Sequence, residues 1–240
     1  MNMRVLVILP AYNEEASIGP VLEGLRAHCK DYDIVVIDDG SRDATAQRVR
    51  ESGLARLVQL PYNLGIGAAM QTGFKFAYRN GYDAAVQCDS DGQHPVEEIP
   101  RLVQKLEDGV ADVIIGSRYV ADSDYRPSMG RRIGKSILSR LIDGLIGGGV
   151  TDTTSGFRVF NRRTLAVFSC HYPEDYPEPE SLVILHRAGL TAAEVPVNMK
   201  PRQGGQTSIT SLRSVYYMVK VALAICIDLF RRFPGKQSHG

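Results

Sequence analysis

The stretch Gln87-Cys88-Asp89-Ser90-Asp91-Gly92-Gln93-His94-Pro95 decides the fold of this 240-residue chain. The apolar run Ala84-Ala85-Val86 leads straight into it and predicts a short buried strand. Asp89 and Asp91 then follow at the carboxyl end of that strand, which in an open α/β sheet is the edge where ligands bind. Because residues two apart in an extended segment point to the same side, we expect both carboxylates to face one ligand.

The two aspartates predict a site for a divalent cation. Neighbouring carboxylates repel each other, and a shared cation removes that cost. Their hard oxygen atoms, with the carbonyl oxygen of Gln93 close behind, favour Mg²⁺ or Mn²⁺, which complete their shells with water and substrate phosphates. The plainer interpretation is a polar turn at a strand end, because Asp and Gly are common turn residues.

Strands and helices alternate around this stretch as far as about residue 118. Apolar runs predict the strands and amphipathic segments predict the helices. In chain order these are 5–9 (strand), 18–25 (helix), 34–37 (strand), 44–51 (helix), 56–60 (strand), 63–77 (helix), 84–86 (strand), 99–106 (helix) and 113–115 (strand). Such alternation gives a mostly parallel sheet wrapped by helices, so the expected fold class is α/β.

The pattern changes after residue 118. Apolar residues at helical spacing, with arginines and a lysine among them, predict a helix over 131–146, and a polar loop covers 151–158. A helix at 180–188, a strand at 193–197, a glycine-containing loop at 202–208 and an apolar helix with a basic end at 215–236 follow. We expect a domain over residues 1–210, in parts 1–118 and 119–210, and a C-terminal helical segment over 211–240.

The net charge and the cysteine content of the sequence limit the classes of function that it can have. The net charge of +1 predicts no nucleic-acid partner, and any anion site must be local. Cys29, Cys88, Cys170 and Cys226 lie far apart and form no C-x-x-C, which favours reduced thiols in the cytosol over a disulfide framework or a zinc site. We expect no signal peptide, and the lack of an uncharged apolar run of about 18 residues predicts no ordinary transmembrane helix.

Common nucleotide and nucleophile motifs do not fit. In Gly65-Ile66-Gly67-Ala68-Ala69-Met70, methionine stands where a dinucleotide-binding fingerprint needs a third small residue, and that motif normally follows the first strand. A phosphate-cradling G-x-x-x-x-G-K-[S/T] loop and a G-x-S-x-G nucleophile elbow are both absent from the sequence. These absences disfavour a dinucleotide-dependent oxidoreductase and a serine hydrolase.

Polar side chains follow the early strands at their carboxyl ends, at Asn13-Glu14, Asp38-Asp39, Asn63 with Gly65, Asp89 with Asp91, and Arg118. Loops on one sheet edge can converge on one crevice. We expect Asp38 or Asp39 to accept hydrogen bonds from a base or a ribose hydroxyl. For Asp39, followed by Gly40, a simple turn is the alternative.

Four of these segments, in their order and spacing, resemble the family 2 inverting glycosyltransferases. They are Pro10-Ala11-Tyr12-Asn13-Glu14, Asp38-Asp39-Gly40-Ser41, Asn63-Leu64-Gly65 and Asp89-Ser90-Asp91-Gly92-Gln93-His94-Pro95. The stretch Asp152-Thr153-Thr154-Ser155-Gly156-Phe157-Arg158 and the loop at Arg202 are similar to the dolichol- or polyprenyl-phosphate mannose or glucose synthase group. The resemblance covers residues 3–210. It implies a GT-A fold, a nucleotide-sugar donor bound mainly by 1–118, a divalent cation on the Asp-x-Asp, and a lipid phosphate acceptor bound by 119–210.

The resemblance also implies roles for single positions. The catalytic positions are Asp91, Asp152 and Arg118, and Asp152 would face the donor sugar. The metal positions are Asp89, Asp91 and Gln93. The positions implied to hold the nucleotide are Pro10, Tyr12, Glu14 and Asp39, with Asp38, Asn63 and Gly65 also expected to bind substrate. The positions expected to meet phosphates are Arg118, Arg131, Arg158 and Arg202, and Ser155 is a further substrate-binding candidate.

Two acceptor chemistries stay open. An alcohol acceptor needs a general base, for which Asp152 is the best candidate. A lipid monophosphate needs none, because its second pKa is about 6 and it is largely a dianion near neutral pH. It needs positioning by arginines, for which Arg118, Arg131, Arg202 and Arg158 are suited. His94 is the neighbour of the metal turn and is not expected to act directly.

The sequence departs from the group in two ways. Many members carry transmembrane helices after the catalytic domain, which are not expected in this sequence, and the absence of Trp removes the Gln-x-x-Arg-Trp motif of processive synthases. We expect one hexose to be transferred, from a donor of the GDP-mannose or UDP-glucose type, by a protein held peripherally on the cytoplasmic face of the membrane through helices 131–146 and 215–236. Packing of these helices on the core, a small membrane-protein partner or a homodimer are alternatives to membrane contact. A soluble transferase to a protein or glycan hydroxyl, and a non-catalytic nucleotide-sugar-binding subunit, are the alternative functions.

Overall fold

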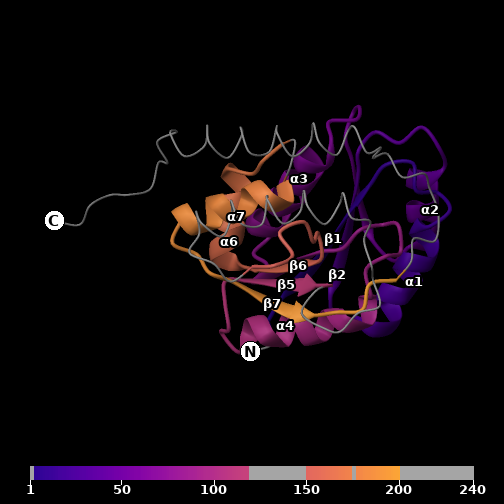
Figure 1. Cartoon of the computed structure of the whole chain (residues 1–240). Helices are drawn as coiled ribbons and strands as arrows, with labels where there is room; N and C mark the ends of the chain where they lie inside the picture. Colours follow the sequence, from indigo (N-terminus) through magenta and orange to yellow (C-terminus); the bar gives the residue numbers. More distant parts are fainter. Residues whose placement is uncertain (1–2, 119–149, 175–176, 201–240) are drawn as a thin grey trace, which may run out of the picture.

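The computed structural model of the chain describes residues 3–118, 150–174 and 177–200. Within these ranges the helices and strands alternate for most of their length (Figure 1). In chain order they are β1 Val5–Ala11, α1 Ile18–His28, β2 Asp33–Asp38, α2 Thr45–Ser52, β3 Arg56–Gln59, α3 Ile66–Arg79, β4 Ala84–Gln87, a 3₁₀ turn Val96–Glu98, α4 Ile99–Glu107, β5 Val113–Ser117, β6 Arg158–Asn161, α6 Arg162–Cys170, α7 Pro177–Arg187 and β7 Ala192–Pro196.

The strands form one seven-stranded sheet in the order β3-β2-β1-β4-β6-β5-β7. The neighbours β1/β2, β1/β4, β2/β3 and β5/β7 are parallel, whereas β6 runs antiparallel to both β4 and β5. The register pairs Val7 of β1 with Ile34 of β2 and with Val86 of β4. This arrangement confirms the expected α/β class with a mostly parallel sheet.

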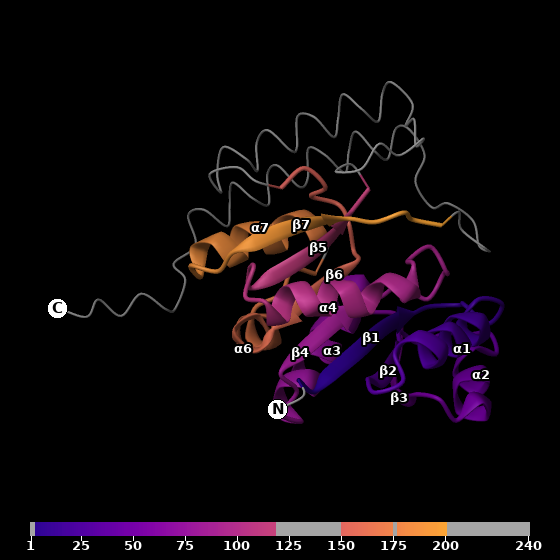
Figure 2. The same ribbon diagram turned by 90° about the horizontal axis from the view of Figure 1, so that it is seen from below.

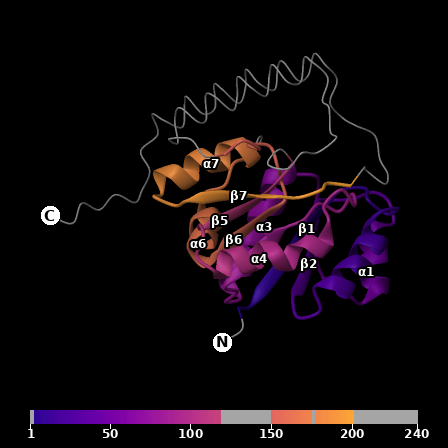
Figure 3. The same ribbon diagram turned by 60° about the horizontal axis from the view of Figure 1, so that its bottom comes forward.

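Helices cover both faces of the sheet because the central strands are apolar on both sides. Leu6 and Ile8 pack with α3, α6 and α7, and Val7 and Leu9 pack with α1, α2 and α4. Figures 1 and 3 show α6 and α7 on one side of the sheet and α4 on the other, and Figure 2 shows α4 lying across the strands from below. Burial of each large apolar side chain contributes about 1.5–3 kcal/mol.

An aromatic cluster joins α3 to the later part of the fold. Phe74 of α3 lies 5.0 Å from Phe160 of β6 and 4.9 Å from Tyr172, measured between ring centroids, in edge-to-face geometry. Phe168 of α6 completes the cluster at 5.4 Å from Phe74. Edge-to-face pairs are favoured by the ring quadrupoles, so this cluster fixes α6 and the segment after it against α3.

The loop expected at 151–158 ends one residue early, and a strand that was not expected follows it. Residues 151–157 are irregular, but Arg158 is the first residue of β6, and Asn161 caps α6 by accepting a hydrogen bond from the Thr164 backbone N–H at 2.9 Å. The helix expected at 180–188 begins earlier, at Pro177, and the strand expected at 193–197 is β7. The sheet therefore contains a four-residue strand, β6, for which no prediction was made.

Among the residues described, no helix combines the length and the apolar character needed to cross a membrane. The helices expected at 131–146 and 215–236, the loop at 202–208 and the boundary expected at residue 210 lie outside the described residues. The division into 1–118, 119–210 and 211–240 stays a prediction.

Candidate active site

A cavity of about 330 Å³ opens at the carboxyl ends of β1, β2 and β4, beside the first turns of α3 and α7. This is the sheet edge where parallel α/β folds place ligands. The sequence-predicted residues that line it are Pro10, Tyr12, Glu14, Asp39, Asn63, Gly65, Asp89 and Asp91. Loops far apart in the chain thus converge as expected.

The turn that carries the two aspartates is held by hydrogen bonds between side chains and backbone groups. Ser90 donates from Oγ to the carbonyl oxygen of Pro10 at 2.8 Å, and the Gln93 N–H donates to Asp91 Oδ1 at 3.0 Å. His94 accepts the Asp89 N–H at its Nδ1, at 2.9 Å. The turn is fixed by these bonds, while the Asp89 side chain keeps 39% of its surface exposed.

His94 is the buried support of this turn. Its ring stacks on Phe157 with 4.8 Å between centroids. Burial lowers the pKa of His94 to about 4, against the raising effect of Asp91. The imidazole is therefore neutral near pH 7, which is the form that can accept the Asp89 N–H at Nδ1.

The cavity lining is acidic. Among the lining residues Glu14, Asp39, Asp89, Asp91 and Glu178 carry carboxyl groups, and the lining that the structure describes contains no Lys or Arg. In the part of the chain that is described, no group of three or more His, Cys, Asp or Glu residues is arranged to hold a metal alone. A pair of carboxylates fits Mg²⁺ or Mn²⁺, which keep water and substrate phosphates as their other ligands.

Gln93 does not line the cavity, and its carbonyl oxygen accepts a hydrogen bond from the Lys200 N–H at 2.9 Å. Its expected role as a third metal ligand stays a prediction.

Asp39 and Asp38 take different places. Asp39 lines the cavity and accepts the backbone N–H groups of Leu64 and Gly65 at 2.7 and 2.9 Å, so it fixes the loop before α3. Burial raises the pKa of Asp39, and these two hydrogen bonds oppose the rise. Asp38 is fully buried and accepts from the Ser41 N–H and from Gln59 Nε2. The structure therefore brings Asp39 to the site and uses Asp38 to shape the turn behind it.

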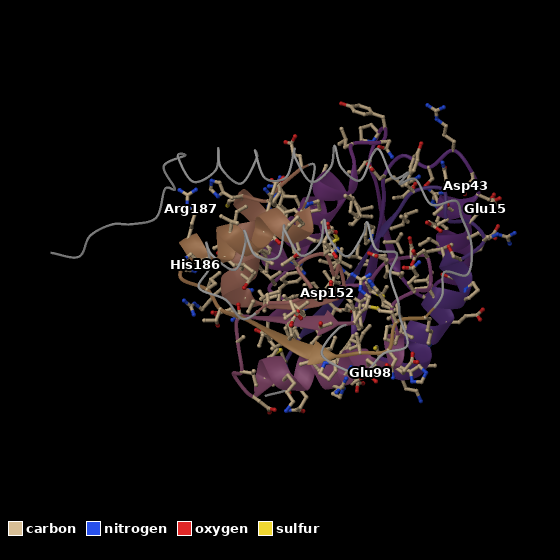
Figure 4. The ribbon with its side chains drawn as sticks, in the orientation of Figure 1. Glu15, Asp43, Glu98, Asp152, His186 and Arg187 are labelled. Atoms are coloured by element: carbon tan, nitrogen blue, oxygen red, sulfur yellow. The ribbon has the colours of Figure 1, made fainter. Side chains whose placement is uncertain are left out.

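Arg118 and Asp152 form a second polar centre, at the end of β5. The Asp152 carboxylate accepts from the Arg118 backbone N–H at 3.1 Å, from Nε at 3.0 Å and from Nη2 at 3.0 Å. Glu194 of β7 in turn accepts the Asp152 backbone N–H at 2.5 Å and the Thr151 hydroxyl at 2.7 Å. Figure 4 shows Asp152 toward the centre of the molecule, with Glu15 and Asp43 near its periphery. Asp152 faces Arg118 and is not part of the cavity lining, in contrast to the expectation that it faces the donor sugar.

Arg158 and Ser155 lie inside the protein. The Arg158 side chain is 1% exposed and donates to the carbonyl oxygens of Ser155 and Thr153 and to Ser181 Oγ. Ser155 donates from Oγ to the Gly116 carbonyl oxygen at 2.7 Å. Both residues were expected to bind substrate, and both instead hold the 152–157 loop against β5 and α7. The physical reason is that a buried guanidinium needs several acceptors, and the carbonyl groups of this loop supply them.

Comparison with known proteins places the chain in a family. The family model described as Glycosyl transferase family 2 matches residues 6–168. The chain belongs to glycosyl transferase family 2. It is 32% identical to the polyprenol monophosphomannose synthase of Mycolicibacterium smegmatis over 92% of this chain and 86% of that protein. It is 31% identical to the undecaprenyl-phosphate mannosyltransferase of Micrococcus luteus over 87% of this chain and 88% of that protein.

A solved structure supports the same assignment for this family 2 transferase. The chain is similar to glucosyl-3-phosphoglycerate synthase from Mycobacterium tuberculosis in complex with Mn²⁺, UDP-glucose and phosphoglyceric acid, with a TM-score of 0.71 and 26% identity. The likeness covers 94% of this chain and 80% of the other. It confirms the expected GT-A fold, and family membership confirms that the chain is a glycosyltransferase.

The transferase contains a cavity residue that the sequence did not single out. Glu178 lies in the first turn of α7 and lines the cavity opposite the strand ends. Burial raises the pKa of Glu178, the charge of Arg158 opposes the rise, and the charge of Asp89 adds to it. The sequence signal was weak, because Pro177-Glu178-Pro179-Glu180 reads as a proline-rich acidic loop. Proline at the start of a helix with acidic residues in its first turn was the available clue.

Two expected phosphate-binding residues of the transferase, Arg131 and Arg202, lie outside the described residues. Their roles stay predictions.

Proposed function

We propose that this chain transfers a single hexose from a nucleoside-diphosphate sugar to a polyprenyl phosphate, with inversion at the sugar carbon and in the presence of a divalent cation. The observation that carries the proposal is the position of the Arg118–Asp152 pair beside an acidic cavity. Arg118 also donates from Nη2 to the Thr154 hydroxyl at 3.3 Å, and a Cβ at Gly156 of the same loop would lie 3.6 Å from Asp89 Oδ1, so the loop that Arg118 contacts packs against the cavity aspartate. A cation-dependent donor site and an anion-binding arginine are what this transfer needs.

The names of the relatives support the acceptor class. The proteins from M. smegmatis and M. luteus are named for a polyprenol monophosphomannose product and for undecaprenyl phosphate. Both alignments span more than four fifths of each chain, so the shared region includes both polar centres. The sugar and the base are not fixed by this support, because the related solved structure holds UDP-glucose.

The donor site would work through its charge. A diphosphate is an anion, and it would be repelled by a cavity lined with Asp39, Asp89, Asp91 and Glu14 unless a cation stood between them. Asp89 and Asp91 would hold that cation, which when bound supplies a Lewis acid that stabilises negative charge on the departing diphosphate. The complex of the related synthase with Mn²⁺ supports this reading.

The chain's other residues would bind and orient the nucleotide. Asp39 holds the loop of Leu64 and Gly65 in place, so the cavity edge is formed before the donor arrives. Tyr12 lines the cavity with a side chain that is 41% exposed, and Pro10 lies beside it, so the pair offers an apolar surface to a base. We assign the nucleotide to this end of the cavity.

The acceptor site supports a phosphate over a hydroxyl. Asp152 is completely buried, and its carboxylate accepts three hydrogen bonds from Arg118. A general base must be able to reach the proton that it removes, within about 3 Å. In this geometry Asp152 acts as a positioning residue, which holds Arg118 ready for an acceptor phosphate that attacks as a dianion. Transfer to a protein or glycan hydroxyl is the second candidate, and Asp152 is the base it would use.

The membrane surface is the proposed location of the reaction. A polyprenyl phosphate presents its phosphate at the membrane surface, so the protein would be held peripherally at the cytoplasmic face. In this scheme residues 1–118 bind the donor, residues 119–210 bind the acceptor and residues 211–240 contact the membrane. A small membrane-protein partner or a second copy of the chain is the alternative contact. A variant that ends at residue 212 should no longer float with liposomes, and equal flotation of both forms would contradict this role.

The function is tested by an assay with two donors and two acceptors. Radiolabelled GDP-mannose or UDP-glucose is incubated with the full chain, Mn²⁺ or Mg²⁺, and liposomes that contain either polyprenyl phosphate or the corresponding polyprenol. We expect label in the lipid fraction with one donor, only with the phosphorylated lipid, and none with EDTA. Label on the polyprenol, or on neither lipid with any donor, would contradict the proposal.

A further inference from the structure

Glu178 belongs to the cavity that adjoins both polar centres of the site. It lines the same cavity as Asp89 and Asp91. The loop 152–157, whose Asp152 binds Arg118, packs against this aspartate pair, because a Cβ at Gly156 would lie 3.6 Å from Asp89 Oδ1. If the leaving diphosphate is held at the aspartates and the acceptor phosphate at Arg118, the sugar that moves from one to the other must lie in the part of the cavity between them, and Glu178 is a lining residue of that cavity.

The position of Glu178 is fixed by contacts on both sides. Gly67 of α3 packs so closely on the preceding segment that a Cβ there would lie 2.2 Å from the Pro173 carbonyl oxygen. On the other side, Ser181 donates from Oγ to the Glu178 carbonyl oxygen at 2.9 Å and receives Arg158 Nη1 at 2.9 Å. Arg158 also holds the 152–157 loop. The start of α7 is therefore tied to both α3 and the acceptor side of the site.

The chemistry of the cavity restricts what Glu178 can bind. A carboxylate repels phosphate oxygens, so neither the diphosphate nor the acceptor phosphate is its partner. Asp89 and Asp91 supply the two carboxylates assigned to the ion, whose other ligands are water and substrate phosphates, so Glu178 is not needed as a third acidic ligand. The remaining partners are neutral hydrogen-bond donors, and a hexose carries several hydroxyl groups.

We propose that the Glu178 carboxylate accepts hydrogen bonds from hydroxyl groups of the donor hexose and so selects the sugar that is transferred. This inference rests on the proposed function and adds the residue that distinguishes one donor sugar from another. Glu178 is a specificity residue in this scheme, and the nucleotide is bound by other side chains. A site built to receive particular hydroxyls rejects sugars that place them differently, because its carboxylate is then left without a partner.

The test compares ligands with and without the hexose. Binding of GDP-mannose, UDP-glucose, GDP and UDP is measured by isothermal titration calorimetry in Mn²⁺, with the full chain and with the variants Glu178→Ala and Glu178→Gln. Glu174→Ala is the matched control, because Glu174 is an exposed acidic residue of the same segment and does not line the cavity. Nucleoside diphosphates contain the ribose and the phosphates, so they report every contact except those to the hexose.

We expect Glu178→Ala to weaken the accepted nucleotide sugar at least tenfold while the matching nucleoside diphosphate changes less than twofold. Glu178→Gln should fall between, since its amide oxygen still accepts a hydrogen bond, and Glu174→Ala should match the unmodified chain. If Glu178→Ala does not fold, Glu178→Gln carries the same comparison. Equal weakening of the nucleotide sugar and the nucleoside diphosphate would assign Glu178 to the nucleotide. No weakening of either ligand would remove Glu178 from the sugar site. Either result would overturn this inference but leave the proposed function standing. Failure of the unmodified chain to bind any of the nucleotide sugars would overturn the proposed function and this inference with it.

Discussion

Arg118 binds the carboxylate of Asp152 through its backbone N–H, its Nε and its Nη2, all within 3.1 Å. Asp152 has no exposed surface, whereas 29% of the Arg118 side chain is exposed. The aspartate thus fixes the guanidinium, and part of the arginine side chain stays accessible. The two acceptor chemistries that the sequence left open predict different results when this pair is altered.

Asp152→Asn should mainly impair binding of the acceptor. The amide keeps the shape but loses the charge that orients Arg118, and charge-assisted hydrogen bonds are worth about 1.5–3 kcal/mol. We expect the KM for polyprenyl phosphate to rise roughly 10- to 100-fold, with kcat reduced less than tenfold and an unchanged pH profile. Initial rates over a range of acceptor concentration in liposomes measure both constants.

A catalytic base at Asp152 would give a different result. Loss of a general base typically costs 10²–10⁴ in kcat. Such a fall in kcat with an unchanged KM, together with loss of the acidic limb of the pH profile, would favour a hydroxyl acceptor. Asp108→Asn, on an exposed aspartate outside the cavity, serves as the control for the loss of one charge.

Gly67→Ala should destabilise the fold and disturb the start of α7. The new Cβ would lie 2.2 Å from the Pro173 carbonyl oxygen and 2.4 Å from that of Glu174, and backbone atoms cannot move aside without shifting the segment. Overpacking of this kind costs about 1–3 kcal/mol. Urea unfolding followed by circular dichroism measures the change.

Gly19→Ala is the matched control for that variant. Gly19 lies inside α1, and nothing lies within 4 Å of the position of its Cβ. Ala at an unstrained helical position stabilises by about 0.4–1 kcal/mol. Equal free energies of unfolding for the two alanine variants would show that Gly67 does not pack on residues 173–174 as described.

The sequence predicted that the strand-end residues converge, and the roles of these residues stay predictions. Asp39, Asn63, Gly65, Asp89 and Asp91 all line the cavity. They were predictable because apolar strands in βα alternation form a parallel sheet, and the carboxyl ends of such strands meet at one edge. For such residues the order of strands and helices along the chain is enough to predict that they lie close together, and tertiary packing need not be known.

The other half of the site depends on packing that local patterns do not encode. β6 has four residues and begins with Arg158, so a polar loop was the natural interpretation, and its insertion between β4 and β5 follows from no periodicity. The burial of Arg158 depends on carbonyl acceptors at Thr153 and Ser155. Glu178 belongs to α7, a helix that covers the sheet, so the rule that ligands bind at strand ends does not predict it.

Asp112→Asn should lower stability in a pH-dependent manner. Asp112 accepts hydrogen bonds from Asn161 Nδ2, Arg163 Nη1 and the Thr191 backbone N–H, and so joins β5, β6 and the segment before β7. Burial raises the pKa of Asp112, but these hydrogen bonds and the charge of Arg163 outweigh it, so the pKa lies below its ordinary value. Loss of the carboxylate should cost about 1–3 kcal/mol at pH 7.

The sign of the pH effect follows from that lowered pKa. The unfolded chain takes up the proton at a pH of about 3.9, before the folded protein does. The stabilisation is therefore complete above about pH 4 and is lost as the pH falls through the folded-state value. Thermal unfolding at pH 7, 4 and 3 should show the gap between the original chain and Asp112→Asn closing in acid, whereas Asp31→Asn, at an exposed aspartate, should show a small gap throughout. A gap that stays constant from pH 7 to pH 3 would refute this role for the carboxylate.

The cation at Asp89 and Asp91 is tested most directly by measuring nucleotide-sugar binding with Mn²⁺ and with EDTA, in the original chain, in Asp91→Ala and in Asp31→Ala. Asp31 is an exposed aspartate outside this cavity and controls for the loss of one charge. We expect Mn²⁺ to tighten binding at least tenfold in the original chain and in Asp31→Ala, and to have no effect in Asp91→Ala. Without Mn²⁺, Asp91→Ala should bind no more weakly than the original chain, because it repels the diphosphate less. Equally tight binding in EDTA, or a full Mn²⁺ effect in Asp91→Ala, would contradict the proposal that this acidic pair binds the cation on which the transfer depends.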